Sequence, residues 1–142
     1  MRYGPIILIE DDADDIEVFQ DVLKELKVDH PLAFFENSQL AKEFLLTHPV
    51  KPFLIICDIN LPRQNGLQFK REIDNDPVLK KKSIPFIFYS TSNDQKTIND
   101  AYTEFSVQGY FQKTDTMAEI KETWRVVLNY WMRCKHPDIK SL

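Results

Sequence analysis

Residues 53–58, Phe-Leu-Ile-Ile-Cys-Asp, form an apolar run that stops at a carboxylate. Such a run is typical of a strand that is buried on both faces, as in a parallel sheet. Residues 59–62, Ile-Asn-Leu-Pro, follow, and Pro62 predicts that the chain turns there. An acid at the C-terminal end of a central parallel strand lies where open α/β sheets bind ligands. Taken alone, Asp58 would equally suit the start of a turn.

The length and composition are those of one globular domain. The chain has 142 residues, of which 43% are hydrophobic and 28% charged, and its net charge is −4. Lys and Arg form no basic stripe, which argues against a nucleic acid as the main ligand. No apolar run approaches the about 20 residues that span a bilayer, and no signal peptide is evident. Cys57 and Cys134 form no disulfide framework, so we expect a cytoplasmic protein without membrane association.

Apolar segments elsewhere in the chain predict four further strands. They lie at residues 5–9, 31–35, 84–89 and 107–112. A helical pattern follows each of the five strands, and the last helix, from Met117, is the longest. This alternation predicts a doubly wound α/β fold. Residues 74–83, with the run Lys80-Lys81-Lys82, predict a solvated loop. We expect one domain over residues 1–134 and a loose tail at 135–142.

An acidic cluster ends the first predicted strand. Asp12 can cap the helix that follows, and Asp14 and Asp15 suit its first turn, so helix capping accounts for all three acids. Capping does not account for Glu10 and Asp11, which precede the cap. These two acids are therefore candidates for a functional role.

Capping residues also mark the starts of other predicted helices. A side-chain acceptor three residues before Glu or Gln is typical of a capping box. The candidates are Asn37 or Ser38 for the second helix, Ser92 with Gln95 for the fourth, and Thr116 with Glu119 for the last.

Polar side chains end four predicted strands and should meet at one edge of the sheet. They are Glu10 with Asp11, Asp58, Ser90 and Lys113. Three neighbouring carboxylates repel one another, and Mg²⁺ relieves such repulsion; without a cation, one carboxyl should hold its proton. A carboxylate can accept a phosphoryl group, which needs positioning and charge neutralisation. Alone, Ser90 could begin a turn and Lys113 could be a solvated charge, but their joint placement favours a site.

Four short motifs occur in a fixed order, each at a strand end. They are Ile-Glu-Asp-Asp at 9–12, Cys-Asp-Ile-Asn-Leu-Pro at 57–62 with Gly66, Tyr-Ser-Thr-Ser at 89–92, and Gly-Tyr-Phe-Gln-Lys at 109–113. With these motifs the chain resembles the receiver domain of two-component response regulators over nearly its whole length. It looks most like the single-domain, phytochrome-associated type. The resemblance implies a flavodoxin-like five-stranded parallel sheet, strand order 2-1-3-4-5, with five helices.

The resemblance also implies the chemistry of the acidic residues. Asp58 takes the place of the phosphoacceptor. Glu10, Asp11 and Asp58 take the places of the acids that hold Mg²⁺, with Asp11 a direct ligand and Glu10 acting through water. The main-chain carbonyl of Asn60 would be a further ligand. Mg²⁺ is therefore the expected cofactor.

Three other residues take the places of the family's remaining functional positions. Lys113 matches the active-site lysine, Ser90 the switch hydroxyl and Tyr110 the switch aromatic. Phosphorylation would draw Ser90 inward, let Tyr110 turn, and change the surface of the fourth helix, fifth strand and fifth helix. For Tyr110 alone, an ordinary role in an amphipathic strand is the alternative.

The expected partners follow from the same resemblance. They are a sensor histidine kinase or phosphotransfer protein, a downstream protein target and a second copy of the chain in a homodimer, with no direct DNA binding. The last predicted helix runs nearly to the end, which suggests a stand-alone receiver. Its Trp124 and Trp131 include at least one core residue, and the other would be an interface anchor if exposed.

Three alternatives compete with this interpretation. A phosphorylation-independent adaptor typically loses a metal-binding acid, the phosphoacceptor or the lysine, all of which this chain keeps. A Mg²⁺-dependent phosphatase would place an acid where Asn60 lies, so we expect no enzyme in the ordinary sense. A flavin-binding module would need a phosphate-cradling loop after the first strand, where this chain has acids.

Two residues depart from the family's pattern. Thr114 follows Lys113 where the family usually has proline after a cis bond. Because a cis bond before another residue costs about 2.5–4 kcal/mol, we expect a rearranged trans loop or a strained one. Thr91 is bulkier than the residue usual beside the switch position. We expect it to narrow access to Asp58 and to slow phosphoryl exchange.

Overall fold

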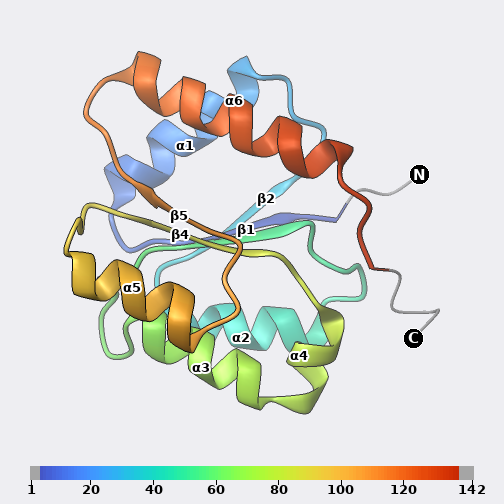
Figure 1. Cartoon of the computed structure of the whole chain (residues 1–142). Helices are drawn as coiled ribbons and strands as arrows, with labels where there is room; N and C mark the ends of the chain where they lie inside the picture. Colours follow the sequence, from blue (N-terminus) through green and yellow to red (C-terminus); the bar gives the residue numbers. More distant parts are fainter. Residues whose placement is uncertain (1–3, 138–142) are drawn as a thin grey trace.

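Five parallel strands form one sheet at the centre of the molecule (Figure 1). The computed structural model describes residues 4–137. The strands are β1 (Ile6–Ile9), β2 (Leu32–Phe35), β3 (Leu54–Cys57), β4 (Phe86–Ser90) and β5 (Gly109–Gln112). Their order is β2-β1-β3-β4-β5, and every neighbouring pair is parallel. The predicted fold class and strand order are confirmed.

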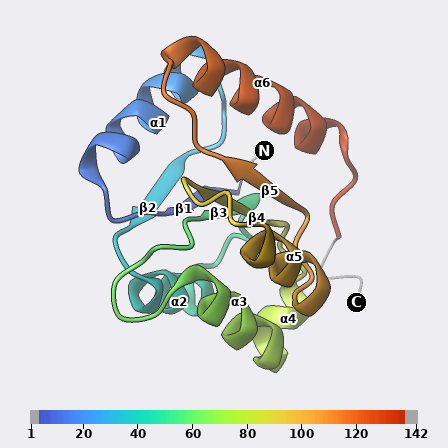
Figure 2. The same cartoon turned by 60° about the vertical axis from the view of Figure 1, so that its left-hand side comes forward.

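Helices cover both faces of this sheet (Figure 2). One face carries α1 (Ala13–Glu25) and α6 (Met117–Arg133). The other carries α2 (Ser38–Thr47), α3 (Gly66–Asn75), α4 (Pro77–Lys82) and α5 (Gln95–Glu104). Because both faces are covered, the side chains of β1, β3 and β4 are buried along their whole length. This explains why these strands are apolar runs without alternation.

The sheet separates two hydrophobic cores. In the core under α1 and α6, Trp124 is fully buried. Its ring meets Phe19 and Tyr89 edge to face, with centroids 5.0 and 4.9 Å apart. Trp131 is half-buried at the margin of the same core. Trp124 is therefore the core tryptophan of the last helix. Trp131 is half-buried, so it does not meet the condition of exposure under which it would be an interface anchor.

The segment predicted as a solvated loop contains a sixth helix, which corrects the expected number of five. Asp76 caps α4 by accepting hydrogen bonds from the N–H groups of Val78 and Leu79, and Pro77 takes the first helical position. Leu79 is buried, whereas the three lysines lie in the last turn, where positive charge suits the helix dipole. Because of the three consecutive lysines, this segment was predicted as a loop, although Asp76 caps a short helix there and Leu79 packs into the core.

The predicted caps are confirmed at three helices and wrong at one. Asp12, Asn37 and Thr116 cap α1, α2 and α6. Helix α5 is capped by Asp94, which accepts from the N–H of Thr97, and not by Ser92. Asp94 lies one residue before the first helical residue, so its carboxylate reaches the free N–H groups that Ser92 is too far back to reach.

Within residues 4–137, no helix is long and apolar enough to cross a membrane. Residues 135–137 of the predicted tail form neither helix nor strand, and the rest of that tail lies outside the described residues.

Candidate functional site

Asp58 lies at the carboxyl end of the central strand β3. Its N–H donates to the carbonyl of Ile9 at 3.0 Å, which continues the ladder between β1 and β3. The side chain is buried, and its Oδ1 accepts a hydrogen bond from the N–H of Asn60 at 3.2 Å. The turn after β3, which Pro62 led us to expect, thus holds Oδ1 of Asp58. It leaves Oδ2 available to other groups.

Glu10 and Asp11 follow β1 and lie beside Asp58. Ile9 pairs with Cys57, so the residues after these two positions leave the sheet side by side. One carboxylate oxygen from each of Glu10, Asp11 and Asp58 lies within 4.8 Å of the other two. Glu10 and Asp58 are buried, and Asp11 is exposed. Three converging oxygen donors with one open side suit a hard divalent cation that keeps some of its water.

The electrostatics of Glu10 show the strain of bringing these acids together. Burial raises the pKa of Glu10 to about 8; the hydrogen bond from Lys113 opposes this rise, and repulsion by Asp58 adds to it. The expectation that one carboxyl holds a proton without a cation thus points to Glu10. A divalent cation among these oxygens would favour the ionised carboxylate.

Lys113 brings a positive charge into the acidic cluster. Its main-chain N–H donates to the carbonyl of Ser90 at 2.8 Å, which fixes the end of β5 against β4. Its Nζ donates to Glu10, to Oδ2 of Asp15 at 2.8 Å and to Oδ2 of Asp58 at 3.2 Å. Burial alone would lower the pKa of Lys113, but the hydrogen bonds to Asp15 and Glu10 and the attraction of Asp58 raise it.

The bond between Lys113 and Thr114 is trans, as are all others in residues 4–137. Of the two expected outcomes, a rearranged trans loop or a strained one, the structure has the trans loop. The ammonium group nevertheless reaches Asp58. Replacement of the family's proline by Thr114 therefore leaves the lysine in the site.

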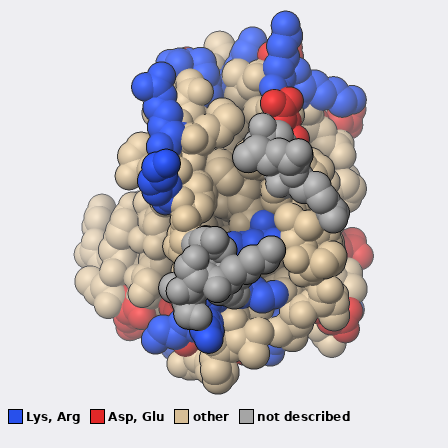
Figure 3. Space-filling model, turned by 90° about the vertical axis from the view of Figure 1, so that its right-hand side faces the viewer, with Lys and Arg blue, Asp and Glu red and all other residues tan. Residues whose placement is uncertain are grey.

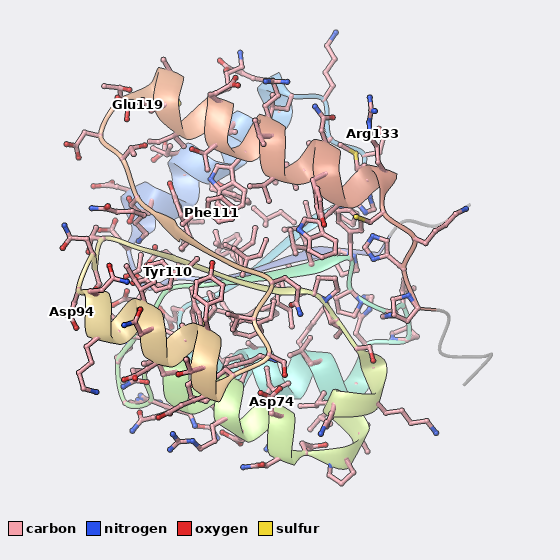
Figure 4. The ribbon with its side chains drawn as sticks, in the orientation of Figure 1. Asp74, Asp94, Tyr110, Phe111, Glu119 and Arg133 are labelled. Atoms are coloured by element: carbon pink, nitrogen blue, oxygen red, sulfur yellow. The ribbon has the colours of Figure 1, made fainter. Side chains whose placement is uncertain are left out.

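Ser90 ends β4, and Tyr110 lies near the start of the neighbouring strand β5, where it pairs with Phe88. Ser90 is fully buried, and its hydroxyl accepts from the N–H of Ser92 at 3.2 Å. The Tyr110 hydroxyl donates to the carbonyl of Ser92 at 2.8 Å. Figure 4 shows Tyr110 on the side of β5 that faces α5, with Phe111 toward α6. Both proposed switch residues thus hold the loop that begins at Thr91, which is itself exposed.

Asp15 is a member of the cluster that sequence reasoning missed, because capping accounted for it fully. Asp12 does accept the N–H groups of Asp14 and Asp15, as expected of an N-cap. The carboxylate of Asp15, however, pairs with Lys113. No local signal could have revealed this pair, because the two residues are 98 positions apart in the chain.

A second group that the sequence did not reveal holds the loop after Asp58. Ser38 donates to Gln64 at 2.5 Å, Gln64 to Glu72 at 2.7 Å, and Lys42 to Glu72 at 2.6 Å. These hydrogen bonds tie the loop to α2 and α3. The hydrogen bonds from Lys42 and Gln64 hold the pKa of Glu72 below its usual range. The loop that carries Asn60 is therefore braced from outside the acidic cluster.

Charge is distributed unevenly between the two ends of the sheet. Figure 3 looks at the end where the termini lie, and Lys and Arg predominate among the charged side chains there. The acidic cluster follows the carboxyl ends of β1 and β3, at the other end of the sheet. Such a distribution raises the local concentration of cations at the cluster.

Comparison with known families decides the class of protein. The model of the response regulator receiver domain matches residues 6–125. The chain belongs to the response regulator receiver family. The match includes all the predicted site residues, from Glu10 to Lys113. Family membership and the geometry of the site therefore rest on the same segment of the chain.

Similar receivers include proteins of the phytochrome-associated type. The chain is 29% identical to the response regulator Rcp1 of Synechocystis over 132 residues, which are 89% of this chain and 88% of Rcp1. It matches the phosphorylated cyanobacterial phytochrome response regulator RcpA with a TM-score of 0.85 and 27% identity, covering 96% and 99% of the two chains. It matches the Mn²⁺-bound form of Rcp1 with a TM-score of 0.82 and 28% identity, covering 95% and 99%.

Proposed function

We propose that this receiver accepts a phosphoryl group on Asp58 from a histidine kinase or phosphotransfer protein and signals through a changed surface. The observation that carries the proposal is the contact of the Lys113 ammonium with Asp58 inside a cluster of three carboxylates. The related structures of phosphorylated RcpA and Mn²⁺-bound Rcp1 support both the modification and the divalent cation.

The acidic cluster suits Mg²⁺. Glu10, Asp11, Asp58 and the main-chain carbonyl of Asn60 would hold the ion, with Glu10 acting through water. A bound Mg²⁺ would supply positive charge to the oxygens of the incoming phosphoryl group. Carboxylate and carbonyl oxygens are the donors that this ion takes, and the exposure of Asp11 leaves a side open to solvent.

The transfer itself needs little more from the protein than position and charge. We assign the Oδ2 atom of Asp58, which faces the Lys113 ammonium, as the nucleophile, while Oδ1 accepts from the N–H of Asn60. Its lone pair forms the new O–P bond, and the P–N bond to the donor histidine breaks with its electron pair returning to the imidazole nitrogen. Lys113 donates to a phosphoryl oxygen, and the Ser90 hydroxyl donates to another.

The switch follows from the hydrogen bonds of the loop after β4. If the hydroxyl of Ser90 moves to the phosphoryl group, the N–H of Ser92 loses its acceptor. Tyr110, which donates to the carbonyl of Ser92, is then free to turn. The surface of α5, β5 and α6 changes as a result. Exposed apolar side chains on α5 and α6 make this surface suitable for a protein partner or a second copy: Tyr102, Val126 and Tyr130.

The adaptor that needs no phosphorylation is the second candidate. Adaptors of this kind typically lose part of the charged site, whereas the lysine and the three acids converge here. We therefore favour a phosphorylated switch that is not an enzyme in the ordinary sense. As the partner of a kinase it would act in the cytoplasm.

Amide NMR spectra with Mg²⁺ and fluoroberyllate, a phosphoryl analogue, test the switch. We expect shifts at the Asp58 loop, at Ser90 and Tyr110, and along α5, β5 and α6. Asp58→Asn should abolish the shifts that fluoroberyllate causes. Shifts confined to the Asp58 loop in the wild type would contradict the proposed surface change, and the absence of any specific shift would favour the adaptor.

A further inference from the structure

The Lys113 ammonium has three carboxylate partners, and one of them stands apart. Glu10 and Asp58 belong to the cluster that is suited to a divalent cation, whereas Asp15 does not. The Nζ–Oδ2 distance is 2.8 Å to Asp15 and 3.2 Å to Asp58. An ammonium group has three N–H donors, so these acceptors saturate it. Asp15 is therefore the one partner of Lys113 that is not committed to the proposed metal site.

The start of α1 sets the position of Asp15. Asp12 caps the helix and accepts the N–H of Asp15 at 3.2 Å, which fixes the backbone at the third helical residue. The Asp15 side chain is 42% exposed, and Lys113 is 9% exposed. Asp14 has the same charge and lies in the same helical turn, but within residues 4–137 its carboxylate forms no hydrogen bond or ion pair.

Packing leaves the Lys113 side chain room to move. A cavity of about 240 Å³ lies beside it, and Asp15 and Lys113 are both in the wall. Lysine has a flexible side chain, so beside a cavity its hydrogen bonds do most to fix the ammonium, which also lies 5.7 Å from the centroid of the Tyr89 ring. The other residues that line this cavity are Val18, Phe19, Tyr89, Thr114, Asp115 and Ile120.

We propose that Asp15 is a positioning residue that holds the ammonium of Lys113 at Asp58 during phosphoryl transfer. This inference rests on the proposed function of Asp58. When Asp58 binds the metal directly and Glu10 binds it through water, Asp15 is the acceptor that serves the lysine alone. Asp15 keeps one N–H occupied and so directs the remaining donors toward the phosphoryl oxygens.

The test compares three variants of the full chain: Asp15→Asn, Asp14→Asn and Asp15→Glu. Phosphoryl uptake from acetyl phosphate is followed by intact mass at saturating Mg²⁺. Asp15→Asn should lower the maximal rate about tenfold, the effect of losing one charge-assisted hydrogen bond. Asp14→Asn removes the same charge from the same turn and should keep the rate within about twofold. Asp15→Glu, at a half-exposed position with room for a longer side chain, should restore most of the rate.

A second measurement separates positioning from a structural role. The acetyl phosphate concentration that gives half the maximal rate should stay unchanged in Asp15→Asn, as should the midpoint of thermal unfolding relative to Asp14→Asn. Equal maximal rates for Asp15→Asn and Asp14→Asn, with an active wild type, would overturn the inference and leave the proposed function standing. No uptake by wild type and Asp14→Asn alike would overturn both.

Discussion

Gly66, the first residue of α3, lies directly against the main-chain carbonyl of Asp58. A Cβ atom at Gly66 would lie 2.4 Å from the Asp58 oxygen and 3.0 Å from Cα of Ile59. The N–H of Gly66 also donates to the carbonyl of Ile59 at 2.9 Å. The main-chain atoms of Asp58 and Ile59 that Gly66 contacts belong to the loop that follows β3 and shapes the site. This glycine is therefore required for close approach of α3 to the residue that we assign as phosphoacceptor.

Gly66→Ala should displace this loop, because the obstructing atoms belong to the backbone and cannot rotate away. We expect the free energy of unfolding to fall by about 1–3 kcal/mol and the affinity for Mg²⁺ to fall with it. Urea unfolding and calorimetric titration measure the two effects. Gly109→Ala is the control, since the three atoms nearest to its Cβ would belong to the ring of Phe111, a side chain and not backbone. Equal losses in both variants would contradict the role given to Gly66.

The raised pKa of Glu10 predicts how stability depends on pH in the presence of a chelator. The folded chain binds this proton more tightly than the unfolded chain does, in which the pKa is 4.5. The stabilisation is complete below that value and is lost as the pH rises through about 8. The free energy of unfolding should fall by about 2 kcal/mol between about pH 6 and about pH 8.

The control for this prediction is Glu10→Gln, which has no proton to lose in that interval. The difference between wild type and variant isolates Glu10 from the histidines, which also titrate there. Mg²⁺ affinity of the wild type should rise over the same interval, because the cation favours the ionised carboxylate. A flat difference between the two urea-unfolding profiles would show that Glu10 is already ionised at about pH 6.

Lys113→Met should have opposite effects on metal binding and on phosphoryl transfer. Removing the ammonium leaves Glu10 and Asp58 without their resident cation, so Mg²⁺ should bind about tenfold more tightly. Transfer from acetyl phosphate should fall by at least about a hundredfold, because a charge on the phosphoryl oxygens is lost. Lys121→Met removes the same charge from a surface pair with Glu25 and should change neither quantity. Weaker Mg²⁺ binding in Lys113→Met would contradict this electrostatic account.

Tyr110→Phe removes the hydrogen bond to the carbonyl of Ser92 and leaves the ring in place. The free energy of unfolding should fall by about 1 kcal/mol, as measured by chemical denaturation. Tyr102→Phe is a suitable comparison, because Tyr102 is 53% exposed and its hydroxyl forms no hydrogen bond within residues 4–137. If the two variants were equally stable, the bond that links β5 to the loop after β4 would contribute nothing measurable.

Much of the fold could be predicted because local patterns and topology agree. Buried strands appear as apolar runs, and a parallel sheet brings their carboxyl ends to one edge. Since Ile9 pairs with Cys57, the acids that follow these two residues lie close together because of the strand pairing alone. The order of the strands, and the position of the acidic motifs at their ends, were therefore enough to predict that Glu10, Asp11 and Asp58 converge.

Among the features that sequence reasoning missed are the helix α4 and the second role of Asp15. Both depend on contacts between segments that are distant in the chain. The lysine run suggested a loop, but Leu79 finds a place in the core and Asp76 provides the cap for α4. Asp15 looked like a helix-start acid because it is one; its second role arises only where α1 meets the end of β5. One side chain can both suit a helix start and pair with a residue far away in the chain, and the local sequence reveals only the first of these roles.

The most direct test of the account is intact-mass spectrometry of wild type and Asp58→Asn after incubation with acetyl phosphate, with and without Mg²⁺. The account predicts one phosphoryl adduct on the wild type, dependent on Mg²⁺, and none on Asp58→Asn. An adduct of equal yield on Asp58→Asn would place the acceptor elsewhere. No adduct on a wild type that binds Mg²⁺ would contradict the phosphorylated switch and favour the constitutive adaptor.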